Sequence, residues 1–321
     1  DIYNLIKHEK IATRYKKNCK NNISNGREPF FLLLSSKINQ MLDWLANIVD
    51  DKGEIPLLND SAYKIAPEFS DLCEYAEQLG FPRPKRRENQ AIFLKNSGYC
   101  ILQNDNFRVL FDCGKIGPDY LPGHAHCDML SFVMYYKGNS VIVDTGVYEY
   151  DEGERRNYCR STKAHNTIMI NGEEQAEIWK SFRVGRRGYP IDFEMGENWV
   201  RCGHTGYERI KRELRHFRKI AIHDNAIEIS DQIKGIGYGQ VEGFLHFAPN
   251  VNLHPEDGRL IVKLALERSE EIEGHELNLE FDGASFELFE SEYFPEFGKI
   301  EKRWSVRLFY NSENVIIKVK R

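Results

Sequence analysis

The sequence lacks the features that define several large classes of protein. Its apolar strings are short, Phe30–Leu34 being typical, and none could span a bilayer. Seven cysteines occur without a CxxC pair, and the odd number argues against a disulfide framework and for a reducing compartment. A net charge of −5 with dispersed basic residues argues against nucleic-acid binding. No signal peptide, internal repeat or low-complexity segment is present, so a globular protein of one or two domains is expected.

The first part of the chain has a helical pattern. Residues 1 to about 80 are predicted to be helical, with an apolar stripe at helical spacing over Phe30–Val49. Pro67 can occupy the first turn of a second helix, which Gly80 would end. Pro- and Arg-rich residues 81–87 are typical of a linker. We therefore expect a helical segment over residues 1–82.

After the linker the pattern changes to short apolar runs separated by turn signals. Runs of this kind are Ala91–Leu94, Tyr99–Leu102, Val109–Phe111, Thr167–Ile170, Ala226–Ile229 and Val315–Val319. Turn signals such as Asn171-Gly172 and Asp257-Gly258 lie between the runs. Long helices do not alternate with these strands, which excludes a doubly wound α/β fold. The predicted fold class is therefore α+β multidomain, with a large antiparallel β-sandwich over residues 83–321.

A cluster of histidine and aspartate stands at the entrance to one strand-like run. In Gly123-His124-Ala125-His126-Cys127-Asp128 two imidazoles lie two residues apart, so on a strand they would share a face. Asp144 and His165 each adjoin a later β-rich run. His and Asp side chains are ligands of divalent metals, and zinc is the first expectation. Taken singly, each histidine near a strand is more often a hydrogen-bonded structural residue than a metal ligand.

These segments resemble the heparinase II/III-like polysaccharide lyases. The resemblance is carried by Gly123–Phe132, Val143–Tyr150 and Arg156–Thr167, in that order and spacing. Glu174-Gln175 and the tract Tyr293–Gly298 extend it over most of the chain. The resemblance implies an incomplete (α/α) toroid joined to an antiparallel sandwich, with residues 1–82 as the tail of the toroid and the active site between the two.

The resemblance also implies three sets of site residues. The zinc ligands of the family correspond to His126, Asp144 and His165. The catalytic set corresponds to His124, Tyr148 and Tyr150. The substrate-binding set corresponds to Arg156, Asn157 and Arg160.

The activity implied by the resemblance is that of a carbon–oxygen lyase acting on an acidic polysaccharide. Such enzymes cleave uronic-acid glycosidic bonds by β-elimination, which needs a base for the C5 proton and an acid for the leaving oxygen. The family's toroid supplies a Tyr, an Asn-His pair and an Arg for this step, and residues 1–30 contain no counterpart. The resemblance therefore leaves open whether this chain is active by itself.

Two other functions fit the same residues. One is a catalytically degenerate glycan-binding or capsule-associated protein built on a metal-stapled sandwich, and the other is a metal-dependent hydrolase. No nucleic-acid or membrane partner is expected, and a homodimer is compatible with the resemblance. The glycan, the oligomeric state and the compartment stay open, because the resemblance implies a periplasmic or secreted protein and the cysteines favour the cytoplasm.

Overall fold

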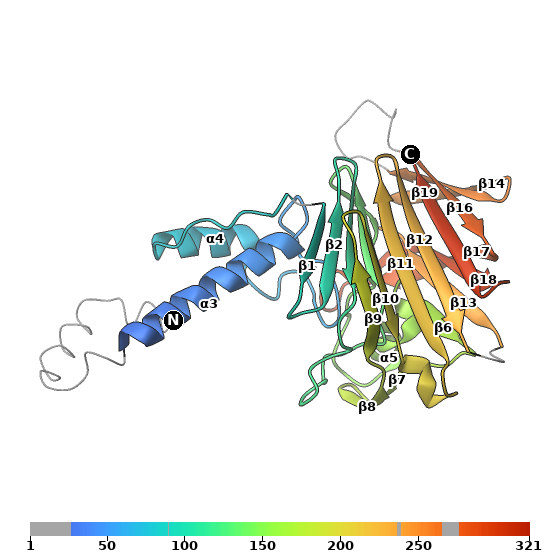
Figure 1. Cartoon of the computed structure of the whole chain (residues 1–321), viewed down its shortest axis with the longest axis horizontal. Helices are drawn as coiled ribbons and strands as arrows, with labels where there is room; N and C mark the ends of the chain where they lie inside the picture. The colour runs from blue at the N-terminus through green and yellow to red at the C-terminus, as the bar shows by residue number, and fades with distance from the viewer. Residues whose placement is uncertain (1–26, 89, 236–238, 265–275) are drawn as a thin grey trace, which may run out of the picture. The chain divides into compact units, whose positions relative to one another are not determined.

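The computed structural model describes residues 27–88, 90–235, 239–264 and 276–321. The chain groups into two compact units. Figure 1 shows the course of the chain and its helices and strands. The first unit comprises residues 1–49 and 67–87, and the second comprises residues 50–66 and 88–321. Residues 50–66 were predicted to belong to the helical segment, but they group with the second unit. There the amide of Tyr63 donates to the carbonyl of Pro295 at 2.8 Å, and the Asp60 carboxylate lies 2.8 Å from Nδ1 of His124. The expected helical structure of residues 1–26 lies outside the described residues.

The first unit contains two described helices. Helix α3 spans Arg27–Ile48 and helix α4 spans Phe69–Gln78. The helix predicted over Phe30–Val49 is confirmed with an earlier start. Helix α4 begins two residues after Pro67, and Gly80 takes the left-handed conformation (φ 85°) that ends it. No helix in the described ranges is both long and apolar enough to cross a membrane.

The second unit is built from four antiparallel sheets. The five-stranded sheet contains, in order, β1 (Ala91–Leu94), β2 (Tyr99–Gln103), β3 (Phe107–Asp112), β4 (Phe132–Tyr136) and β5 (Asn139–Ile142). The eight-stranded sheet contains, in order, β14 (Val251–Glu256), β15 (Arg259–Leu264), β16 (Glu276–Asp282), β19 (Asn314–Lys320), β12 (Ala226–Lys234), β11 (Arg215–His223), β10 (Trp199–His204) and β9 (Pro190–Met195).

The two remaining sheets are smaller. The four-stranded sheet contains, in order, β17 (Ala284–Tyr293), β18 (Glu301–Tyr310), β13 (Val241–His246) and β6 (Ile168–Ile170). Strands β7 (Ala176–Trp179) and β8 (Arg183–Arg187) form a hairpin. Three short helices complete the described part of the unit: α5 (Glu154–Arg160), η1 (Thr162–Ala164) and η2 (Gly206–Arg209).

The alternation of buried and exposed side chains along the strands explains why they form a sandwich. In β12 and β19 every second side chain is buried, and Ile229 of β12 faces Ile317 of β19 across the register. These side chains join one hydrophobic core with residues of the five-stranded and four-stranded sheets. An isolated bridge joins Ile142 at the end of β5 to Phe247, which directly follows β13. The predicted α+β class with an antiparallel sandwich is therefore confirmed.

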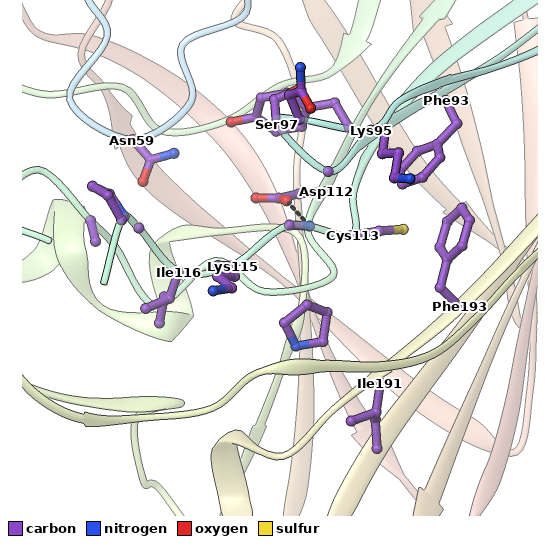
Figure 2. A pocket seen from close by; sticks show the side chains of 18 of the residues that line it. Asn59, Phe93, Lys95, Ser97, Asp112, Cys113, Lys115, Ile116, Ile191 and Phe193 are labelled. Atoms are coloured by element: carbon purple, nitrogen blue, oxygen red, sulfur yellow. Dashed lines mark hydrogen bonds between the residues drawn. The ribbon is translucent and has the colours of Figure 1, made fainter. Parts of the chain in front are cut away.

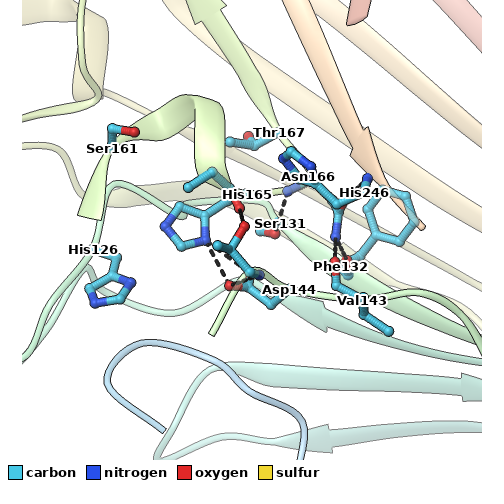
Figure 3. A network of polar contacts seen from close by, with 12 residues as sticks. His126, Ser131, Phe132, Val143, Asp144, Ser161, His165, Asn166, Thr167 and His246 are labelled. Atoms are coloured by element: carbon cyan, nitrogen blue, oxygen red, sulfur yellow. Dashed lines mark hydrogen bonds and ion pairs between the residues drawn. The ribbon is translucent and has the colours of Figure 1, made fainter. Parts of the chain in front are cut away.

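One buried asparagine connects the sheets near the predicted site. The side-chain nitrogen of Asn166 donates hydrogen bonds to the carbonyl oxygens of Phe132 (2.8 Å) and Val143 (3.0 Å). Its side-chain oxygen accepts from the amide of His246 at 2.7 Å (Figure 3). Because these partners lie on or beside strands β4, β5 and β13, Asn166 fixes the loop that also carries His165.

The cysteines are dispersed through both units. The six that the structure describes are free thiols and all are buried, and Cys19 lies outside the described residues.

Candidate active site

Among the three predicted metal ligands, His165 contacts Asp144 and its ring lies beside that of His126. His126 precedes β4, Asp144 follows β5, and His165 follows the short helix η1, as Figure 3 shows. All three side chains are buried, with exposures of 0, 1 and 0%. The rings of His126 and His165 lie 5.3 Å apart, and Nδ1 of His165 lies 2.9 Å from Oδ2 of Asp144.

Burial and charge set the protonation of the two imidazoles in opposite directions. Burial lowers the pKa of His126 to about 4, against the opposing effect of a nearby carboxylate, so this ring is neutral near pH 7. Burial also acts against the charged form of His165, but the adjacent Asp144 carboxylate outweighs it and raises the pKa of His165. The neutral ring of His126 is the form that binds a metal ion.

A metal ion fits the donor atoms of this cluster in part. Nδ1 of His126 and Nε2 of His165 are buried and have no hydrogen-bond partner, an arrangement that a cation would satisfy. Asp144, however, is engaged by His165 and by the amide of Thr145 at 2.8 Å. Within the described ranges no three His, Cys, Asp or Glu side chains form a ready metal-holding group. Zinc binding by His126, Asp144 and His165 therefore stays a prediction.

Asp60 is the centre of the site, and sequence reasoning missed it. Its carboxylate lies 2.8 Å from Nδ1 of His124 and 2.9 Å from Nε2 of His126, and it accepts two hydrogen bonds from the guanidinium of Arg156. Burial would raise the pKa of Asp60, but His126 and Arg156 outweigh it and hold that pKa far below its usual range. Asp60 is therefore a permanent anion linking both histidines of the 124–126 motif.

His124 is the exposed member of this network. Its side chain is 67% exposed, whereas that of Asp60 is 5% exposed. Since Asp60 bonds to Nδ1, the Nε2 atom of His124 is the ring nitrogen left for a ligand. A buried carboxylate that orients an exposed imidazole is an arrangement suited to proton transfer.

The two predicted tyrosines differ in their surroundings. The ring of Tyr150 lies 5.8 Å from the His124 ring, and partial burial raises the pKa of its hydroxyl. The ring of Tyr148 instead lies 5.6 Å from Phe294, with the guanidinium of Arg155 at 4.8 Å. The structure thus brings Tyr150, and not Tyr148, into contact with His124.

The predicted substrate-binding residues lie on helix α5 and face in different directions. Arg156 and Arg160 are 0 and 1% exposed, and their guanidinium groups bond to Asp60 and to backbone carbonyls. Asn157 is exposed, and its backbone amide bonds to Gly153 within the helix. The arginines therefore support the site from within the protein, and contact between any of these three residues and a substrate stays a prediction.

A cavity of about 840 Å³ opens beside His124 (Figure 2). Its far end holds Phe93 and Phe193, whose rings stack at 4.3 Å, with Lys95 on the β1–β2 turn. Asp112 lies in the wall, where burial raises the pKa of its carboxyl well above the usual value and Oδ1 accepts from the amide of Gly114 at 2.7 Å. The cavity therefore provides room for a ligand that extends beyond the immediate surroundings of His124.

The fold is that of known heparinases. A heparinase III gene product superimposes with a TM-score of 0.67 at 17% identity, over 88% of this chain and 46% of that structure. Heparan sulfate lyase HepC from Pedobacter heparinus superimposes with a TM-score of 0.63 at 16% identity, over 85% of this chain and 45% of that one. At these identities the likeness concerns the fold alone, and the chain spans less than half of either structure.

The sequence comparisons give the family. The sequence model of the heparinase II/III-like C-terminal region matches residues 86–320. Because this is most of the chain, the protein belongs to the heparinase II/III-like family. An exo-oligoalginate lyase of Saccharophagus degradans is 27% identical over 89 residues, which are 24% of this chain and 12% of that protein. The named relatives are thus polysaccharide lyases, and the resemblance stated from the sequence is confirmed.

Proposed function

We propose that this chain is part of a lyase that cleaves uronic-acid-containing glycans by β-elimination. The observation that carries the proposal is the exposed His124, whose Nδ1 is held at 2.8 Å by the buried Asp60 and whose ring lies against Tyr150. The lyases named above, acting on heparan sulfate and oligoalginate, support the reaction class. Because the chain spans less than half of those structures, the proposal concerns the protein that contains this chain.

In the proposed reaction the two groups have complementary roles. Nε2 of His124 takes the C5 proton of the uronate ring, which is acidic because the carbon is α to a carboxyl group. The electron pair of the broken C5–H bond forms a C4=C5 double bond, and the C4–O4 bond breaks. The hydroxyl of Tyr150 gives a proton to O4. Asp60 stabilises the imidazolium formed at His124, as a permanent anion 2.8 Å from its other nitrogen.

One requirement favours the second candidate, a glycan-binding protein without lyase activity. Removing the C5 proton places charge on the uronate carboxyl group, which must be neutralised by a cation or hydrogen-bond donors. The two arginines beside the site, Arg156 and Arg160, are buried and bonded to protein groups. Neither arginine is therefore free to neutralise the uronate carboxyl group, and a protein in which no other group does so would bind the glycan without cleaving it.

We further propose that His126 and His165, with Asp144, hold a zinc ion. The support is the pair of buried ring nitrogens that have no partner in the protein. Bound there, zinc would supply positive charge and fix the segment that carries His124. We expect about one zinc per chain by elemental analysis of the purified protein and a clear loss of zinc in His126→Ala. Equal metal content in both proteins would contradict the site.

The reaction itself is tested by the product. Oligoalginate and heparan sulfate oligosaccharides are incubated with the wild-type chain, with His124→Gln and with His254→Gln, an exposed histidine on β14 that serves as the matched control. A lyase gives an ultraviolet-absorbing unsaturated product, which His124→Gln abolishes and His254→Gln does not. New reducing ends without that absorbance would indicate a hydrolase. Binding without either product would leave the glycan-binding alternative.

A further inference from the structure

A turn outside the predicted motifs presents an aromatic ring beside His124. Residues 180–182 connect strands β7 and β8, Arg183 begins β8, and the ring of Phe182 lies 5.6 Å from His124 and 5.3 Å from Tyr150. On the other side of Tyr150, the ring of Phe297 lies 4.9 Å away. Phe182 and Phe297 are 42 and 38% exposed. Three aromatic side chains therefore form a wall next to the exposed imidazole.

Hydrogen bonds from two buried arginines hold the backbone of this turn in place. Arg156 donates two hydrogen bonds to the carbonyl of Ser181, at 3.0 and 2.8 Å. Arg160 donates to the carbonyls of Lys180 (2.6 Å) and Arg183 (2.9 Å). Hydrogen bonds from buried charged donors are strong and directional, so the turn keeps one conformation before any ligand arrives. An aromatic ring kept exposed on a fixed backbone loses little freedom when a ligand packs against it.

The same segment carries two positively charged residues close to Phe182 in the sequence. Lys180 and Arg183 flank Phe182 and are both exposed. Among the residues that the structure describes, no carboxylate forms an ion pair with either side chain, unlike Arg186, which pairs with Glu177. A segment that carries an exposed apolar ring and two unpaired cations is complementary to a ligand that combines an apolar face with negative charges.

We propose that this aromatic wall, made of Tyr150, Phe182 and Phe297, stacks against one pyranose ring of an acidic glycan. Lys180 and Arg183 bind the carboxylate or sulfate groups of that ring or its neighbours. The inference rests on the proposed function, since the ligand is the glycan that reaches His124. It also makes Arg156 and Arg160 positioning residues, which act on the glycan through the backbone of the turn.

The test measures binding and not cleavage. The whole chain carrying His124→Gln, so that the probe stays intact, is titrated by calorimetry with oligoalginate and with heparan sulfate oligosaccharides. Adding Phe182→Ala should raise Kd for the bound probe about tenfold. Phe182→Trp, which keeps an aromatic face, should restore Kd to near the parent value. The matched control is Trp304→Ala, another exposed aromatic residue, on β18, which should leave Kd unchanged.

A second variant tests the charges. The double change Lys180→Gln and Arg183→Gln should weaken binding and reduce its dependence on salt, because two counter-charges of the glycan lose their partners. Three results would each overturn the proposed aromatic wall. They are binding by Phe182→Ala that equals that of the parent, an equal loss of binding in Trp304→Ala, and no binding of either probe by the parent. Cleavage by the wild-type chain with normal binding by Phe182→Ala would refute the wall alone. Loss of binding in Phe182→Ala, together with no cleavage by the wild type, would refute the proposed lyase activity and leave the aromatic wall.

Discussion

Two buried aspartates organise the second unit in different ways. Asp60 contacts His124, His126 and Arg156. Asp231 lies 2.7 Å from Nε2 of His216, and it accepts from Arg218 at 2.7 and 2.8 Å and from Tyr310 at 2.6 Å. Each carboxylate thus binds histidine and arginine, and in each case these partners hold the aspartate pKa far below its usual range, against the effect of burial.

The surroundings of the two aspartates decide what each can do. Asp231 faces Arg218 across neighbouring strands β12 and β11, and both side chains are fully enclosed. Asp60 lies in an irregular segment, and one of its partners, His124, is 67% exposed. The same residue types therefore form a structural support where the strands enclose them and a candidate reactive site where one partner reaches solvent.

The largest effect is expected from breaking the enclosed network. Asp231→Asn keeps the shape of the side chain but leaves the buried Arg218 guanidinium without its counter-charge, which should cost about 3–5 kcal/mol of unfolding free energy. Denaturant unfolding measures the change. Lys302→Gln, which breaks the exposed pair with Glu290, is the control and should cost less than about 1 kcal/mol. Similar costs for both variants would contradict the distinction drawn for Asp231.

A smaller effect, concentrated on activity, is expected at the open site. If the protein is a lyase, Asp60→Asn should reduce kcat on the order of 10²-fold, because His124 loses the anion that orients it and stabilises its charge. The assay follows formation of the unsaturated product, corrected for the folded fraction, and the pH profile is recorded for both proteins. A fall in kcat no larger than the fall in folded fraction, with an unchanged pH profile, would make Asp60 a purely structural residue.

The smallest effect concerns acid stability. Because the folded-state pKa of Asp231 is depressed, its stabilising contribution is fully present above about pH 4 and is lost as the pH falls toward the folded pKa. Between pH 4 and the lowest pH at which the folded protein can be measured, the unfolding free energy of the wild type should fall by on the order of 2 kcal/mol more than that of Asp231→Asn. Urea unfolding at several pH values provides the measurement. Parallel curves for the two proteins would show that Asp231 does not titrate in this way.

Local pattern predicted much of the fold. Alternation at Val315–Val319 gave a strand because every second side chain enters the core, and Pro67 and Gly80 bracketed a helix because their backbone preferences act within a few residues. The resemblance named His126, Asp144 and His165 as one set, and the structure places the His165 ring beside both the His126 ring and the Asp144 carboxylate.

The other parts of the site depend on contacts between distant residues. Asp60 stands 64 positions from His124 and 96 from Arg156, and only its place in a turn-like Asn59-Asp60 pair marks it in the sequence. The resemblance implied that Arg156 and Arg160 bind a substrate, but both side chains are buried. Their burial depends on carbonyl groups of residues 180–183, which no local pattern reveals.

The hydrogen bonds of Asn166 have a practical consequence for how the protein unfolds on heating. Since one side chain holds Phe132, Val143 and His246 together beside His165, the loop at the site cannot open without disrupting the sandwich. Local and global unfolding should therefore share one free energy in this region, and amide hydrogens there should exchange only with the whole unit. Any molecule that binds this loop would then raise the melting temperature of the entire sandwich, which turns a simple thermal scan into a search for ligands.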